Sequence, residues 1–212
     1  MGSVSDTIAR RGYHHGDLRA QLIRDGLAVL AETGTLGFSV AKVAARAGVS
    51  SGAPYRHFRD REALLAACAA TVAHELADRL AESAEAAGDD PVEQLAATAG
   101  AYALYVAQHR VGLELIYADD FQGSHYHELH EAGRHFIDVM LPLATAAATA
   151  DTILGVMELL EAHLALAHGY ATFQLQGAFG QNRRSPEDLP RLATTAARAL
   201  ITGRSTAAAA RG

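Results

Sequence analysis

Residues 39–61 read SVAKVAARAGVSSGAPYRHFRDR, and this stretch decides the fold. Ser39 is a predicted N-cap, because a serine hydroxyl can accept a hydrogen bond from an unpaired amide of the first helical turn. Apolar residues then recur at helical spacing up to Ala47. Gly48 follows, at a position that needs a left-handed backbone, which glycine adopts without steric strain. The stretch therefore predicts two short helices joined by a tight glycine turn.

The second of these helices is expected to begin at a small, uncharged tip and to end in aromatic and basic residues. Ser50 or Ser51 is its expected N-cap. Pro54 is tolerable because it falls in the first turn, where its missing amide costs no helical hydrogen bond. In a helix-turn-helix this end of the second helix meets base edges in the major groove. We therefore interpret the stretch as a DNA-binding helix-turn-helix, with an ordinary helical hairpin as the alternative.

The residue types suit two kinds of contact with DNA. Small side chains at the tip allow close approach, serine can bond to bases or phosphates, and Ala53 or Pro54 can pack on a thymine methyl group. Tyrosine, histidine and arginine carry donors for phosphate oxygens. The predicted DNA-binding residues are Arg11, Ser39, Lys42, Ser50, Ser51, Gly52, Ala53, Pro54, Tyr55, Arg56, His57 and Arg61.

Three motifs resemble the tetracycline-repressor (TetR) family of bacterial regulators. They are Val43-Ala-Ala-Arg-Ala-Gly-Val-Ser50, Pro54-Tyr-Arg-His-Phe58 and Arg61-Glu-Ala-Leu-Leu65, and the resemblance covers about residues 12–66. It implies an N-terminal DNA-binding domain, a C-terminal helical domain that binds a small ligand, and a homodimer. By position, the phosphate-contacting tyrosine and histidine of the family fall on Tyr55 and His57. The family's lysine at the start of the fourth helix falls on Arg61, which keeps the charge but not the geometry.

Two further motifs resemble one branch of this family. Tyr13-His-His-Gly-Asp-Leu-Arg19 is similar to the entry to the first helix in that branch. Ala167-His-Gly169 is similar to the Trp-His-Gly signature of its ligand domain, with alanine in place of tryptophan. This departure leaves the branch assignment open.

The charge distribution favours DNA binding although the formal net charge of the 212 residues is −6. Residues 1–61 carry a net charge of +4, and the remainder carries −10. A basic head on an acidic body orients a protein on a polyanion. The single cysteine, Cys68, excludes an internal disulfide framework and fits a reducing cytoplasm. We expect neither a signal peptide nor a membrane-spanning helix.

The helical apolar period and the scarcity of strand-forming residues predict an all-α protein. We expect a mobile N-terminal arm in residues 1–15, with Arg10 and Arg11 able to reach a minor groove, or else a plain disordered tail. A three-helix helix-turn-helix domain is expected in 16–61, a helical bundle for ligand binding and dimerisation in 62–203, and a disordered tail in 204–212. Expected helix starts lie at Asp17, Asp60, Pro91, Ser124, Asp151 and Ser185, and Pro142 is an expected kink.

The segment Ile153–Leu175 carries apolar residues on almost every face. Such a helix must be buried on two sides. The core covers one side, and a partner chain is the simplest cover for the other. A second helix with an apolar stripe follows after Ser185. If these two helices pack against the same two helices of a second chain, they form a four-helix dimer interface; a large monomeric core is the alternative. The predicted interface residues are Leu160, Leu164, Leu192, Ala196 and Leu200.

Several aromatic, methionine and histidine residues within 92–175 can line a ligand cavity. Mostly apolar walls with a few polar tips are what such a site needs, and ordinary core packing is the alternative. The predicted lining residues are Tyr102, Tyr105, His109, Tyr117, Phe121, Phe136, Met140, Met157 and His163.

The histidine-rich segment 125–135 does not predict a metal site. His127, Glu131 and His135 lie at i, i+4 and i+8, and the outer pair is separated by ~12 Å of helix rise, too far for one ion. A solvated helix face is the favoured interpretation, and we expect no metal and no cofactor.

The remaining motifs leave an enzyme as a weak alternative. No Gly-rich phosphate loop or nucleophile elbow stands out, although a histidine-rich chain always offers acid–base groups. An architectural DNA binder is a third reading, which the long apolar C-terminal helices argue against. The sequence thus predicts a cytoplasmic transcriptional regulator that binds a palindromic operator as a homodimer and responds to an unknown small-molecule effector. Repression is favoured over activation on the family resemblance only.

Overall fold

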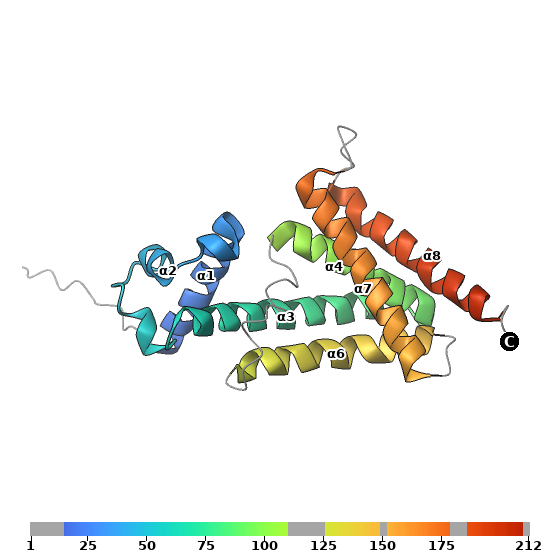
Figure 1. The fold of residues 1–212 in the computed structure, drawn as a ribbon, viewed down its shortest axis with the longest axis horizontal. Helices are drawn as coiled ribbons and strands as arrows, with labels where there is room; N and C mark the ends of the chain where they lie inside the picture. Colours follow the sequence, from blue (N-terminus) through green and yellow to red (C-terminus); the bar gives the residue numbers. More distant parts are fainter. Residues whose placement is uncertain (1–14, 110–125, 149–151, 179–185, 210–212) are drawn as a thin grey trace, which may run out of the picture. The chain divides into compact units, whose positions relative to one another are not determined.

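The computed structural model describes residues 15–109, 126–148, 152–178 and 186–209. Within these ranges every regular element is a helix, which confirms the predicted all-α class (Figure 1). The elements are α1 (His15–Gly37), α2 (Val40–Arg46), the 3₁₀ helix η1 (Pro54–Arg56), α3 (Arg61–Ala86), α4 (Pro91–His109), α6 (His127–Ala147), α7 (Ile153–Gln176), the 3₁₀ helix η3 (Pro186–Asp188) and α8 (Leu189–Ala209).

The chain divides into two compact units, Met1–Leu64 and Leu65–Gly212. The boundary falls inside α3, slightly after the Arg61 limit expected from the sequence. Of the arm predicted in residues 1–15, residues 1–14 lie outside the described residues and His15 begins α1. The disordered tail predicted for 204–212 is wrong for residues 204–209, because α8 continues to Ala209. Alanine has the highest helix propensity, which favours continuation of the helix through this alanine-rich end.

The first unit is held together by a small apolar core between α1, α2, η1 and the start of α3. Its fully or nearly buried side chains are Leu22, Leu30, Phe38, Val43, Pro54, Phe58 and Leu64. The predicted cap of α2 is confirmed, since Ser39 Oγ accepts from the Lys42 amide at 3.3 Å. The predicted glycine turn is confirmed as well, because Gly48 has a φ of 69°.

The second helix of the helix-turn-helix differs from the prediction. Only the three residues of η1 are helical, and Ala53, not Ser50 or Ser51, stands at the N-cap position, with no side-chain cap. Residues 51–53 form a turn instead, closed by a hydrogen bond from the Ala53 amide to the Ser50 carbonyl at 2.9 Å. Pro54 opens η1, in keeping with its tolerated place in a first turn.

Local capping sets the later helix starts. Asp60 Oδ1 accepts from the Ala63 amide at 2.7 Å and Pro91 opens α4, as predicted. The cap of α7 is Thr152, whose Oγ1 accepts from Gly155 at 3.2 Å. The predicted cap Asp151 lies outside the described residues, and so do Ser124 and Ser185. Pro142 lies inside α6, and the kink predicted there stays a prediction.

The core of the second unit is built around α4, which contacts α6, α7 and α8. Figure 1 shows the last turn of α7 and the first turn of α8 at the same end of this unit, with the two helices next to each other, and α6 running along α3, where His135 meets Asp78. Gly100 allows the closest approach, because a Cβ atom there would lie 2.7 Å from the Pro190 carbonyl oxygen and still closer to Thr194 Oγ1. Arg198 on α8 adds two hydrogen bonds to the Glu93 carboxylate on α4, at 2.5 and 2.7 Å. No described helix has the length and apolar character required to cross a lipid bilayer.

Candidate DNA-binding surface and ligand domain

The tip of the helix-turn-helix exposes most of the residues predicted to meet DNA. Ser50, Ser51 and Gly52 are exposed, and Ala53 is half-buried. Tyr55 keeps 54% of its surface exposed although it is a large aromatic side chain. The remaining predicted contacts along this stretch are Arg56, which is exposed, and His57, which is half-buried.

Pro54 is the exception at this tip. Its relative exposure is below 2%, so of the two alternatives for packing on a thymine methyl group the structure favours the half-buried Ala53 over Pro54. Pro54 and Phe58 instead anchor the tip to the core, and the amides of His57 and Phe58 both donate to the Pro54 carbonyl at 2.9 Å. Anchoring at these two positions leaves the intervening Tyr55 and Arg56 directed to solvent.

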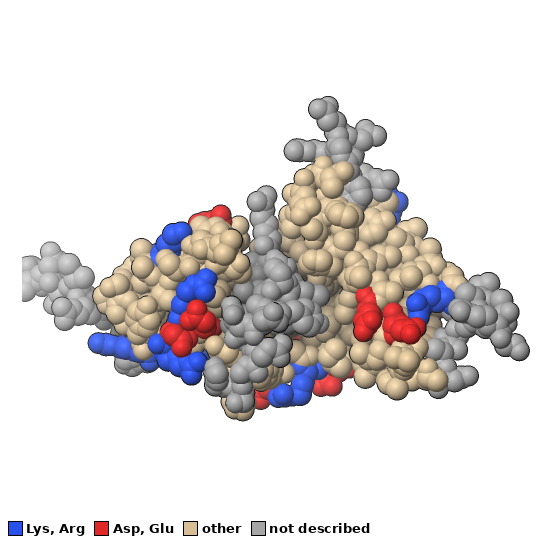
Figure 2. Space-filling model, in the orientation of Figure 1, with Lys and Arg blue, Asp and Glu red and all other residues tan. Residues whose placement is uncertain are grey.

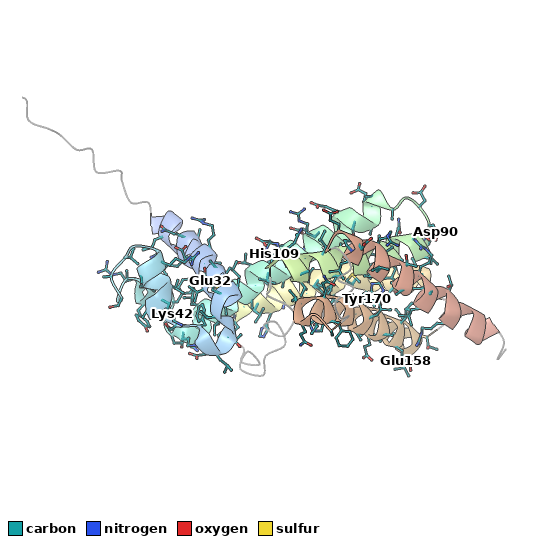
Figure 3. All side chains as sticks on the ribbon, turned by 90° about the horizontal axis from the view of Figure 1, so that it is seen from above. Glu32, Lys42, Asp90, His109, Glu158 and Tyr170 are labelled. Carbon is teal, nitrogen blue, oxygen red and sulfur yellow. The ribbon has the colours of Figure 1, made fainter. Side chains whose placement is uncertain are left out.

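Several basic residues of the first unit bond to other groups of the same unit. Lys42, labelled in Figure 3, donates from Nζ to the Gly37 carbonyl at 2.7 Å. Arg46 pairs with Glu32 at 2.8 Å, and Figure 2 shows basic and acidic side chains next to each other on the visible face of this unit. Arg61 donates to two backbone carbonyls. Arg11, the predicted minor-groove contact, lies outside the described residues.

A surface groove of about 420 Å³ lies in the second unit between α3 and α4. Its lining residues are Arg79, Glu82, Ser83, Ala101, Leu104, Tyr105, Gln108 and His109. Only Tyr105 and His109 among them were predicted pocket residues, and their rings stack with centroids 4.3 Å apart. Tyr105 Oη donates to Glu75 at 2.9 Å. Burial, reinforced by the Glu75 charge, raises the pKa of Tyr105, so its hydroxyl keeps its proton.

The other predicted pocket residues do not line this groove. Tyr102, Phe136, Met140 and His163 are buried, and Met157 is half-buried. Tyr117 and Phe121 lie outside the described residues.

The α4–α7 contact contains a buried histidine with one unpaired nitrogen. Thr98 Oγ1 lies 2.7 Å from the Leu95 carbonyl, its acceptor, and 2.8 Å from His163 Nε2. Among the described residues Nδ1 of His163 has no hydrogen-bond partner, and burial lowers the pKa of His163 to about 4. The imidazole is therefore neutral at physiological pH, with one ring nitrogen unpaired within the described part of the chain.

The histidine-rich segment acquires partners from α3. His135 Nε2 lies 3.0 Å from Asp78 Oδ1, and the His135 ring is 5.3 Å from that of His74. His127 and Glu131 are exposed. Across the described ranges no three histidine, cysteine, aspartate or glutamate side chains are grouped to hold a metal ion.

The surfaces of α7 and α8 revise the predicted dimer interface. Leu160 is only 2% exposed in a single chain, so its assignment to the interface is wrong. Leu164, Leu192, Ala196 and Leu200 are half-buried and keep part of their surface available. Four apolar residues of α7 that are not among the predicted interface residues are exposed in the single chain, namely Ile153, Leu154, Phe173 and Leu175. Because α7 is apolar on nearly every face, no polar stripe marks which leucines face inward.

The fold and the tip define an all-helical protein with an N-terminal helix-turn-helix unit and a separate helical bundle. Residues 22–68 match the family model of bacterial regulatory proteins of the tetR family. Residues 22–68 therefore form a DNA-binding domain of this family, whose members are transcriptional regulators rather than enzymes.

One curated regulator and several solved structures resemble the chain. The chain is 39% identical over 79 residues to the HTH-type transcriptional regulator BetI of Stenotrophomonas maltophilia, a match that spans 37% of the chain and 40% of that regulator. A protein of unknown function from Rhodococcus sp. RHA1 is 30% identical, with a TM-score of 0.72 over 92% of this chain and 98% of the other. The regulator FadR of Bacillus subtilis, solved in complex with stearoyl-CoA, shares the fold at 18% identity, with a TM-score of 0.66 over 87% of this chain and 98% of the other.

Proposed function

We propose that the protein is a ligand-responsive transcriptional repressor that binds a palindromic operator as a homodimer. The observation that carries the DNA-binding part is the exposed tip from Ser50 to Ala53, followed by outward-facing Tyr55 and Arg56 on a closed core. A small tip that is anchored at Pro54 can enter a major groove, while the tyrosine and arginine reach the phosphates beside it.

A dimer is supported by the apolar surface that one chain leaves on α7 and α8. The exposed apolar residues of α7 and the half-buried Leu192, Ala196 and Leu200 of α8 form a surface that water solvates poorly. A second copy that packs the same two helices against them gives a two-fold interface. Two recognition tips would then read two operator half-sites about 34–36 Å apart, one turn of DNA.

The effector site is proposed to lie in the second unit. Two features support this: the groove between α3 and α4, whose volume is in the range of small-molecule sites, and the unpaired Nδ1 of buried His163. A buried polar nitrogen without a partner is uncommon, and a hydrogen-bonding group of a bound ligand would satisfy it. The complex of FadR with stearoyl-CoA is a precedent for a ligand on this fold.

Selection of duplexes from a random pool, followed by footprinting, tests the proposal. The purified protein should enrich a palindrome and protect two half-sites. If it retains no duplex at low ionic strength without added effector, the DNA-binding proposal fails. Transcription from a promoter that carries the selected site then separates the two modes, because a repressor lowers the transcript level and an activator of the same fold raises it.

A further inference from the structure

Arg61 stands where the sequence predicts a phosphate contact, but the structure gives its guanidinium a different set of partners. Arg61 Nη2 donates to the Thr35 carbonyl at 2.7 Å, and Nε donates to the Phe38 carbonyl at 3.2 Å. Nη1 lies 3.3 Å from Glu62 Oε1. The guanidinium also lies over the Phe38 ring, 5.7 Å from its centroid. All three nitrogens are thus directed at groups of the same unit.

The two carbonyls belong to the short segment that leads into α2. This segment follows Gly34, where the helical backbone is broken with a φ of 65°, and it ends at Ser39, the N-cap of α2. Lys42 holds a third carbonyl of the segment, that of Gly37, at 2.7 Å. The entry to α2 is therefore braced by one cation from α2 itself and one from the start of α3.

A planar guanidinium suits this task better than an ammonium group. Its N–H donors point in fixed directions, so one side chain can reach two carbonyls at once, whereas the lysine ammonium is a single point charge. Side-chain exposure of 37% shows that Arg61 is only partly available to solvent. A switch to a phosphate would leave both carbonyls without this donor.

We propose that Arg61 is a positioning residue for operator binding: it fixes the segment Thr35–Phe38, and through it the start of α2, instead of neutralising a phosphate. This inference rests on the proposed DNA-binding function. The salt-dependent contacts then come from the exposed end of η1, where Arg56 is the cation next to Tyr55. The two arginines are thereby assigned separate roles that the sequence alone does not distinguish.

Three variants test this assignment on the full-length protein with the duplex selected from the random pool. Arg61→Ala removes the brace, Arg61→Lys keeps the charge but not the two-carbonyl geometry, and Arg56→Ala removes an exposed charge of the same type. Operator affinity is measured as a function of salt concentration. Hydrogen exchange of the amides in residues 35–46 is followed in parallel without DNA.

Both Arg61 variants should lose affinity about tenfold at every salt concentration, with the wild-type salt slope, and should exchange faster in residues 35–46. Arg56→Ala should flatten the slope by about 0.9, the value for one phosphate contact, with unchanged exchange. Titration of each variant with excess duplex gives the fraction of protein that can bind, and so checks that the loss of affinity is not caused by unfolded protein.

Two results would overturn the assignment. If Arg61→Ala flattens the slope by about 0.9 while Arg61→Lys restores wild-type affinity, then Arg61 is a phosphate contact. If both Arg61 variants keep wild-type affinity and wild-type hydrogen exchange, then the Arg61 hydrogen bonds do not position the segment Thr35–Phe38. If the wild-type protein binds no duplex at all, the proposed function fails, and the exchange data still decide whether Arg61 holds this segment.

Discussion

Replacement of Gly100 by alanine tests the packing that organises the second unit. A Cβ atom at this position would lie 2.7 Å from the Pro190 carbonyl oxygen, well inside the contact distance of real Cβ atoms. The neighbouring Thr194 hydroxyl can rotate away, but the Pro190 carbonyl is backbone and cannot. The helices α4 and α8 must therefore move apart, although the Glu93–Arg198 ion pair also links them.

The expected loss of stability follows from two opposing effects. Overpacking of a close contact costs about 1–3 kcal/mol. Alanine is favoured over glycine inside a helix by about 1 kcal/mol, which offsets part of this cost. We expect Gly100→Ala to lower the free energy of unfolding by about 1 kcal/mol, with a range from near zero to 2.

Gly133 in α6 provides a matched control, because a Cβ atom there meets nothing within 4 Å. Gly133→Ala should raise the free energy of unfolding by about 1 kcal/mol. Urea unfolding followed by circular dichroism, at one fixed protein concentration, measures both variants. The difference between them is the packing cost itself, and Gly100→Ala being as stable as Gly133→Ala would refute the close approach of α4 and α8.

Three further outcomes are expected. Tyr55→Ala should weaken binding about equally on all duplexes with an unchanged salt slope, because a neutral hydroxyl displaces no counterion, and a loss confined to particular sequences would contradict a phosphate role. Leu164→Glu should yield monomers in sedimentation, since Leu164 is half-buried in the single chain; a stable dimer would remove α7 from the interface. Because the folded chain holds the pKa of His163 at about 4 against 6.5 for a free histidine, the unfolded chain binds an extra proton between these values. The free energy of unfolding should therefore fall as pH decreases from 6.5 towards 4, by roughly 3 kcal/mol at full protonation. In urea titrations the His163→Asn variant should lose this pH dependence. A variant with the same pH dependence as the wild-type protein would refute the buried neutral state of His163.

Features set by neighbouring residues could be predicted from the sequence. The Ser39 and Asp60 caps, the turn at Gly48 and the start at Pro91 depend on a few adjacent side chains and on backbone preferences. The all-α class could be predicted as well, because the apolar period is also a pattern among residues that are close in sequence. These are also the features that the motif resemblance covers in the first unit.

Features that depend on packing between distant segments could not be predicted. Arg61 meets Thr35 and Phe38 across the first unit, and His135 meets Asp78 on another helix, with no sequence signal for either contact. Pro54 was placed correctly in a first turn, but its burial depends on the surrounding core. On α7 the unbroken apolar pattern could not separate Leu160, which is buried, from Leu164.

The position of Cys68 has a practical consequence for measuring these properties. It is the one cysteine of the chain, it is buried, and burial raises the pKa of its thiol to about 12. Because thiolates are the reactive form, maleimide dyes will modify it only when the surrounding helices open. A cysteine introduced on the exposed surface can therefore carry a fluorophore selectively while the native thiol stays in place.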